Sequence, residues 1–190
     1  MFDSDRVYNT QNDRIWAENC DEANQKDGIH QKKKFPVKVM VWLGVCSKGV
    51  SPLVNFEQGT VDHDRYIKEL LPVALKYGNH VFGNDWTFQQ DGARPYTHHL
   101  TQQWCHDNFP VFIEKDHWPP TSPDLNLLDY CIWNEFVKVI NWNKVTSKAT
   151  MIQEFKKAVK KIRKDVVFES CNSWTNRLYH MSQNNGDYLR

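Results

Sequence analysis

The order of elements in the sequence predicts an α/β fold in which a mixed sheet carries helices on its faces. Apolar and β-branched residues run almost without interruption over 37–46, which is typical of a strand covered on both faces. Further along the chain, segments with apolar residues at helical spacing alternate with short apolar segments. A hairpin followed by strand–helix–strand crossovers produces a mixed sheet flanked by helices.

Length and composition predict one folded domain over 1–190. A chain of 190 residues is long enough to bury a sizeable core. Its 40% hydrophobic and 13% aromatic residues exclude an unfolded polar tail. The 24 basic and 23 acidic side chains leave a net charge of +1, so any binding of nucleic acid must depend on local basic patches.

The sequence has no pattern of a membrane or secreted protein. No apolar run approaches the roughly 20 residues of a membrane span, and no charged n-region precedes an apolar h-region as in a signal peptide. The five cysteines are widely spaced and include no C-x-x-C pair, which argues against a disulfide framework or a zinc site. We expect an intracellular protein with reduced thiols.

The first long strand is expected to form a hairpin with the segment that follows it. Residues 47–49, Ser-Lys-Gly, have turn chemistry. The apolar segment 51–56 then supplies a second strand. This hairpin is the expected start of the sheet.

The residues before the hairpin give weaker signals. Residues 1–34 are polar and irregular, with one very short expected strand at 14–17. Lys32, Lys33 and Lys34 form a run of positive charge. Such a run fits a solvated loop better than a phosphate contact, and both interpretations stay open.

Helical spacing of apolar residues predicts a helix from Asp62 to about residue 77. Asp62 is a suitable N-cap, and Gly78 suits the C′ position directly after the helix. Pro72 lies inside the segment and predicts a kink. The apolar face expected to pack on the core consists of Ile67, Leu70, Leu71, Ala74 and Leu75.

A strand–helix–strand unit is expected in the middle of the chain, followed by a loop rich in proline. The prolines at 119, 120 and 123 forbid regular structure in that loop. Asn126 or Ser122 then caps a helix that carries Asp129. The expected segments of the unit are a strand over 81–90, a helix over 97–108 and a short strand over 111–113.

Two amphipathic helices are expected at the C-terminal end, before a frayed tail after Asn184. Ser147 caps the first of them, with an apolar side made of Ile152, Phe155, Val159 and Ile162. The opposite side is basic and carries Lys156, Lys157, Lys160, Lys161 and Lys164. The packing stripe of the last helix is Val167, Cys171, Trp174, Leu178 and Met181.

Asp91 and Asp129 are the candidate metal ligands. Ligands of open α/β sheets lie at the carboxyl ends of strands, where Asp91 is expected, and Asp129 is expected in the first turn of a helix. Two such carboxylates can converge on Mg²⁺ or Mn²⁺, which prefer oxygen ligands. Without further context, an aspartate after a strand is more often a turn former or a cap.

The residues around the two aspartates resemble the catalytic-domain motifs of Tc1/mariner-type transposases. The motifs are Gln-Gln-Asp-Gly-Ala-Arg-Pro at 89–95 and Trp-Pro-Pro-x-Ser-Pro-Asp-Leu-Asn at 118–126, the latter followed by Leu-Asp-Tyr. Residues 11–14, 41–42 and 83–85 are also similar to that family, so the resemblance covers essentially the whole chain. It implies an RNase H-like fold and a site of three carboxylates that binds divalent metal. It also implies DNA cleavage and joining of 3′ ends to a target.

Carried over residue by residue, the resemblance makes Asp91 the second acid of the triad and Asp129 the third. The 37 residues between them, and Asp in place of Glu as the third acid, imply a mariner-like subgroup. Asp124 matches a different family position, and we interpret it as a loop or capping residue. Tyr96 and Leu127 depart from the family, which usually has His and Pro at these places.

The first acid of the triad is expected four residues before Phe2, and so before Met1. We therefore expect a catalytic domain with a truncated first strand and without the preceding helix-turn-helix region. Asp3 and Asp5 are poor substitutes, because an odd number of residues separates each from the expected position, so their side chains should point to the other face of a strand.

Other candidate sites are weaker. His98 and His99 would diverge by about 100° on a helix, which makes them poor ligands of one ion. Lys160 and Lys161 are candidate contacts for DNA phosphates, although a solvated amphipathic surface is the more frequent role of such a face.

Three hypotheses result. The chain is a truncated transposase domain that binds DNA and is inactive alone; or a non-catalytic module, derived from a transposase, that binds nucleic acid or protein; or an active nuclease with a substitute acid at Asp3 or Asp5. The resemblance further implies a nuclear protein, DNA as the partner through transposon ends and target, and a homodimer.

Overall fold

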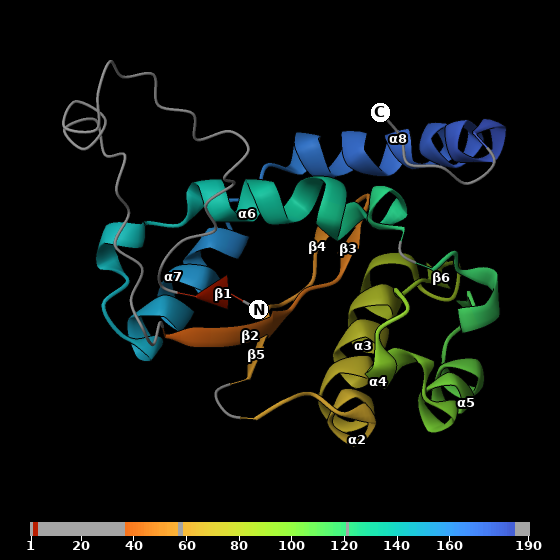
Figure 1. Cartoon of the computed structure of the whole chain (residues 1–190), viewed down its shortest axis with the longest axis horizontal. Helices are drawn as coiled ribbons and strands as arrows, with labels where there is room; N and C mark the ends of the chain where they lie inside the picture. Colours follow the sequence, from red (N-terminus) through yellow and green to blue (C-terminus); the bar gives the residue numbers. More distant parts are fainter. Residues whose placement is uncertain (1, 4–36, 57–58, 121, 185–190) are drawn as a thin grey trace, which may run out of the picture.

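The computed structural model describes residues 2–3, 37–56, 59–120 and 122–184 (Figure 1). Helices make up most of it, and the strands of the described residues form one three-stranded sheet and two pairs. β2, β3, β4 and β5 lie in the middle of the view in Figure 1, with α8 along the top and with β6, α3, α4 and α5 on the right. The interpretations placed on 11–14, 14–17, Lys32 to Lys34 and Asp5 lie outside the described residues.

The expected hairpin is present, but its first strand is divided. β2 Lys38–Trp42 lies between β1 Phe2–Asp3 and β5 Val54–Phe56, and both pairings are antiparallel. The continuation β3 Val45–Cys46 pairs instead with β4 Gly49–Val50. The division has a local cause, because the Gly44 N–H donates to the Ser51 hydroxyl at 2.8 Å in place of a ladder bond.

The helix expected from Asp62 is also present and is longer than expected. Its cap is confirmed, because a carboxylate oxygen of Asp62 accepts from the Arg65 N–H at 2.9 Å. The disturbance expected at Pro72 takes the form of a π-helical segment directly before it, so that Pro72 stands in the first turn of the next helix. The pieces are α2 His63–Arg65, η1 Tyr66–Leu70 and α3 Leu71–Phe82.

Gly78 does not end this helix, so its predicted role is wrong. The helix continues to Phe82 and ends at Gly83, whose φ of 63° suits a residue without a side chain. A Cβ atom on Gly78 would lie 2.4 to 2.6 Å from ring atoms of Trp86. A glycine is needed here because an aromatic ring packs directly on the helix backbone.

The strand–helix–strand unit is confirmed with shorter strands. The strand predicted over 81–90 is reduced to β6 Thr87–Phe88, because the helix α3 takes up its first residues. β6 pairs in parallel with β7 Val111–Phe112, as a crossover requires. The helices between these strands are α4 Arg94–Thr97 and α5 His99–Asn108.

The proline-rich loop contains two short 3₁₀ turns, η2 Lys115–His117 and η3 Pro123–Leu125. The helix that follows begins with a π-helical turn, η4 Leu128–Ile132, and continues as α6 Trp133–Val139. A third 3₁₀ turn, η5 Trp142–Lys144, leads to the C-terminal helices.

The two C-terminal helices form as predicted. Ser147 caps α7 Lys148–Val159 in a reciprocal box with Thr150. α8 Lys164–Gln183 packs on β3 and β4 and on the η3 turn. Of its predicted stripe, Val167 and Met181 are buried, whereas Leu178 is exposed.

Two clusters of buried side chains hold these elements together. The first, here the α6–α7 core, joins β2 to α6, α7 and the start of α8. The second, the α3–α5 core, joins β5, η1, α3 and α5 and is rich in aromatic rings. Buried members of the α6–α7 core include Val39, Leu43, Ile132, Phe136, Met151 and Phe155, and those of the α3–α5 core include Phe56, Tyr66, Leu70, Leu71, Cys105 and Phe109.

Two expectations from composition can be compared with the described residues. Cys46, Cys105, Cys131 and Cys171 are all free thiols there. None of the described helices is both long enough and apolar enough to cross a membrane.

Candidate metal centre

Asp91 stands in the loop after β6 and is tied to the α3–α5 core through its neighbour. Its carboxylate accepts from the Ala93 N–H at 3.0 Å, which closes a tight turn. The Gln90 side chain accepts from the Tyr66 hydroxyl at 2.8 Å and donates to the Tyr96 carbonyl at 3.3 Å. The rings of Tyr66 and Tyr96 lie 4.3 Å apart, so two tyrosines and one amide hold the residue before Asp91.

Asp129 stands in the first turn of η4. The Asn126 side chain accepts from the Leu128 N–H at 3.2 Å, and the Asp129 N–H donates to the Asn126 carbonyl at 2.9 Å. Asn126 is therefore the residue that caps this helix, as one of the two predicted alternatives, whereas Ser122 makes no capping bond at η3. The cap satisfies N–H groups that would otherwise lack partners at the start of the helix.

α8 fixes the segment that leads to Asp129. The Trp174 indole N–H donates to the Leu125 carbonyl at 2.9 Å. The Tyr130 hydroxyl donates to the Ser170 carbonyl at 2.7 Å, and the guanidinium of Arg177 lies 3.9 Å from the centre of the Tyr130 ring. Residues 40 to 53 positions away in sequence thus bond to the segment on either side of Asp129.

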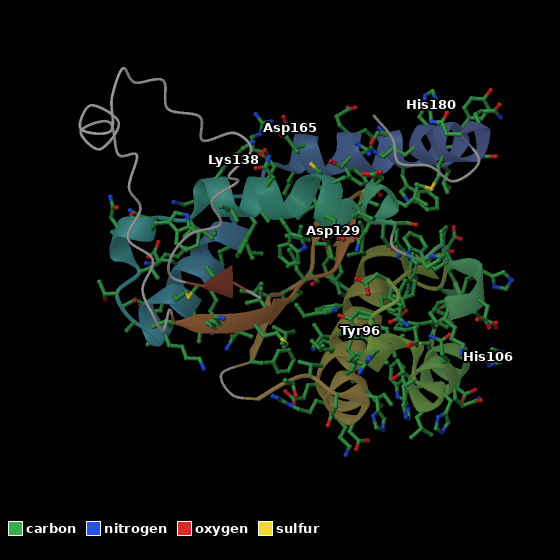
Figure 2. All side chains as sticks on the ribbon, viewed as in Figure 1. Tyr96, His106, Asp129, Lys138, Asp165 and His180 are labelled. Atoms are coloured by element: carbon green, nitrogen blue, oxygen red, sulfur yellow. The ribbon has the colours of Figure 1, made fainter. Side chains whose placement is uncertain are left out.

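Both aspartates line one cavity of about 580 Å³ between the two cores. Figure 2 shows Asp129 and Tyr96 near the middle of the molecule, with Tyr96 on α4 and Asp129 on η4. Both aspartates are only partly covered, and Asp129 is the more exposed of the two. Other side chains around them are Tyr66, Gln90, Tyr96, Asn126, Leu127 and Trp174.

The electrostatics of the cavity show that the two carboxylates interact. Partial burial raises the pKa of Asp129, the negative charge of Asp91 raises it further, and a hydrogen bond from Asn126 opposes both. Burial also raises the pKa of Tyr96, with a second contribution from Asp91. The fold therefore places two like charges where a cation between them would relieve their repulsion.

The chemistry of this donor set suits a hard divalent cation. Asp91 and Asp129 offer carboxylate oxygens, the ligands that Mg²⁺ and Mn²⁺ prefer. Mg²⁺ is commonly held by one or two carboxylates together with water and substrate phosphates. Within the described ranges, no group of three His, Cys, Asp or Glu side chains has the geometry to hold a metal ion.

The histidines differ from their predicted arrangement. His98 has extended backbone angles and precedes α5, so His98 and His99 do not diverge on one helix. Their rings lie 4.4 Å apart, and His98 stacks on His63 at 3.6 Å. The three rings do not form a metal-binding group.

Of the lysines predicted to contact DNA, the two in the described residues lie outside the cavity of Asp91 and Asp129. Lys160 and Lys161 are exposed directly after α7 and do not line it. Asp124 does not line it either; its carbonyl accepts from Arg177 at 3.2 Å, in agreement with a loop role. The backbone of Asp3 belongs to β1, opposite Lys38.

Tyr66 and Trp174 are cavity residues that the sequence did not identify. Both occur in apolar patterns, Tyr66 beside a helix face and Trp174 within a packing stripe, and neither pattern distinguishes a side chain that lines a site from one that only packs. One sequence feature could have indicated Tyr66. Gln90 is a polar residue next to Asp91, and a half-buried glutamine side chain needs a hydrogen-bond partner, which here is the Tyr66 hydroxyl.

Comparison with known proteins supports the fold. No protein-family model matches the sequence, and no curated protein does. The Mos1 transposase paired-end complex with left transposon end has a TM-score of 0.71 and 14% identity over 97% of this chain and 51% of that chain. The Mos1 mariner paired end complex with Mn gives 0.70 and 16% over 97% and 52%.

The catalytic domain of Mos1 mariner transposase has a TM-score of 0.64 and 16% identity, and covers 80% of this chain and 75% of that one. The chain spans about half the length of the transposases in the two complexes. At these identities the likeness shows the fold, which is α/β and RNase H-like, as predicted.

Proposed function

We propose that the chain is part of the catalytic domain of a mariner-like DNA transposase, with Asp91 and Asp129 as two of its metal-binding carboxylates. The observation that carries the proposal is their convergence. Two aspartates with 37 residues between them in sequence line one cavity, in a fold similar to that of the Mos1 catalytic domain. The loop after β6 carries one of these aspartates and the first turn of η4 carries the other.

The residues of the chain have distinct roles in this proposal. Asp91 and Asp129 hold the cation, and Asn126 caps the helical turn that carries Asp129. Tyr66 and Gln90 position the Asp91 loop. When bound, Mg²⁺ or Mn²⁺ supplies Lewis acidity toward the phosphodiester and toward the attacking oxygen.

We further propose that the 190-residue chain alone does not cut or join DNA. Family chemistry uses three carboxylates, and among the described residues no third one joins Asp91 and Asp129 in a metal-binding group. Two carboxylates can hold an ion with water, but they leave the placement of a second ion undefined. DNA, a nuclear location and a homodimer remain part of the proposal.

A nicking assay tests this function. Supercoiled plasmid is incubated with the purified chain and with Mg²⁺ or Mn²⁺, beside Asp91→Asn as the control for a contaminating nuclease. We expect no nicking above that control. Nicking by the wild-type chain that Asp91→Asn abolishes would contradict the inactive state. If Asp3→Asn or Asp5→Asn, made separately in the wild-type chain, also abolished this nicking, the hypothesis of a substitute acid would be supported.

The second candidate, a non-catalytic module that binds nucleic acid, is favoured by the same incomplete ligand set together with exposed lysines after α7. It is distinguished by binding without chemistry. Salt-dependent retardation of duplex DNA that is unchanged in Asp91→Asn would support it, and loss of retardation in the Lys160→Ala, Lys161→Ala double variant would place binding on the basic face.

A further inference from the structure

A second hollow, of about 780 Å³, lies beside the metal-site cavity and is lined by basic side chains from four elements. Lys48 comes from the turn between β3 and β4, and His80 from α3. Lys156 and Lys160 come from α7 and its end, and Lys164 from the start of α8. Among the described residues, no aspartate or glutamate lines this hollow, here named the basic groove.

The lysines of the basic groove differ from other lysines of the same region. Neither Lys156 nor Lys160 forms an ion pair with a carboxylate of the described residues, and the same holds for Lys48 and Lys164. Lys157, on the same helix, bonds to Glu154 at 2.8 Å. The groove therefore concentrates four positive charges without internal neutralisation, which favours an external polyanion.

The basic groove also separates Lys160 from Lys161, which the sequence grouped together. Lys160 lines the groove, whereas Lys161 does not. Lys161 lies instead within electrostatic range of Glu154, together with Lys157 and Lys144. The basic face predicted from the sequence is thus divided in two. Lys160 belongs to the groove, whose lysines have no carboxylate partner, and Lys161 belongs to the group of lysines around Glu154.

The position of the groove relates it to the metal site. Ser51 and Tyr77 line both the basic groove and the cavity that contains Asp91 and Asp129. The two hollows are therefore neighbours that share a wall. A chain of phosphates in the groove would run close to the site at which we propose that a phosphodiester is held.

We propose that the basic groove binds the phosphodiester backbone of DNA, an assignment that rests on the proposed function. The lysines line a concavity, which suits a strand entering it better than the flat surface of a bilayer. Its floor is apolar, so sugars and base edges can contact it while phosphates meet the ammonium groups. The floor consists of Val50, Leu53, Val159, Ile162 and Val167.

The test compares two variants of equal charge. One carries Lys48→Gln, Lys156→Gln and Lys160→Gln in the groove; the control carries Lys144→Gln, Lys157→Gln and Lys161→Gln around Glu154. Binding of a fluorescein-labelled random-sequence duplex of about 20 base pairs is followed by anisotropy as NaCl is varied. All six lysines are exposed. Because Lys157→Gln also removes the bond to the buried Glu154, thermal melts of both variants verify that each remains folded at the temperature of the binding assay.

We expect the groove variant to bind the duplex about 10-fold or more weakly at low salt. It should also reduce the slope of log K against log salt by about 2 to 3, because each lost phosphate contact contributes about 0.9. The control should change affinity less than about 3-fold. If the groove variant proves unstable, Lys160→Gln alone should still weaken binding more than Lys161→Gln alone.

Two results would overturn the groove while leaving the proposed function intact: wild-type binding that neither variant weakens, or equal weakening by both. Absence of duplex binding by the wild-type chain at about 20 mM NaCl would instead contradict DNA binding itself. Tighter, groove-dependent binding of phosphatidylserine vesicles or of polyglutamate would reassign the groove to a membrane or to an acidic protein.

Discussion

Asp91 and Asp129 reach the same cavity from two parts of the molecule that are built differently. Asp91 follows a two-residue strand and depends on the polar bonds of Gln90. Asp129 begins a helix whose next turns place Ile132 and Phe136 at 0% exposure in the α6–α7 core. One half of the site is held by a few hydrogen bonds and the other by buried apolar surface, so different substitutions should disturb them.

The largest effect is expected from Phe136→Ala, on the Asp129 side. Its ring lies 5.3 Å from that of Phe155 and 6.0 Å from that of Trp133, so truncation leaves a cavity and should lower the free energy of unfolding by about 3 to 5 kcal/mol. Urea unfolding measures it. The exposed Lys138→Ala should cost less than about 1 kcal/mol, and equal losses in the two variants would disprove the assignment of the core.

Gly78→Ala tests the Asp91 side, because the substitution has two opposing effects on the free energy of unfolding. Alanine in a helix gains about 0.5 to 1 kcal/mol over glycine, but here its Cβ would meet the Trp86 ring at 2.4 to 2.6 Å. Overpacking should win, with a net loss of about 1 to 3 kcal/mol. The loss should shrink when Trp86→Ala is also present, and a stabilised single variant would show that the ring does not pack there.

Trp174→Phe and Tyr66→Phe compare the hydrogen bonds of the two sides. The first removes the donor to the Leu125 carbonyl, and the second removes the donor to Gln90. Each should cost about 1 kcal/mol, because a partner is left without its bond. The comparison is sharpened by metal affinity: Tyr66→Phe should weaken Mn²⁺ binding more than Trp174→Phe does, because the core still holds the Asp129 helix.

An effect confined to alkaline pH is expected through Cys105, as a loss of stability. Burial raises the pKa of this thiol to about 12, from an ordinary value of 9.0. The folded chain then keeps a proton that the unfolded chain has released, so stability falls as the pH rises above about 9. By pH 10 the loss should be about 1 to 2 kcal/mol.

Urea unfolding at pH 8 and pH 10 measures this change, with Cys105→Ala as the matched variant. The variant should lose less stability between the two pH values than the wild-type chain does. An identical pH dependence of the two would show that the Cys105 thiol titrates alike in the folded and unfolded chains.

Local signals predicted the helix caps and the places of Asp91 and Asp129 relative to the strands and helices. Asp62, Asn126 and Ser147 act as caps because a short polar side chain beside an apolar helix satisfies free N–H groups wherever it occurs. The position of Asp91 after a strand and of Asp129 in the first turn of a helix follows from the same local chemistry.

Long-range contacts account for what the sequence could not predict. Gly78 was misassigned because Trp86, which requires the missing side chain, reaches it only after the chain turns at Gly83. The bond from Trp174 to Leu125 spans 49 positions, and helical spacing carries no information about such a partner. The basic groove was missed for the same reason, since Lys48 and Lys160 meet only in the fold.

Binding of Mn²⁺ tests the shared site most directly. Free Mn²⁺ is titrated by electron paramagnetic resonance against the wild-type chain, Asp91→Asn, Asp129→Asn and the double variant. If both carboxylates hold one ion, each single variant should lose most of the affinity and the double variant should lose little more. Equal binding by all four proteins would contradict a metal site formed by Asp91 and Asp129.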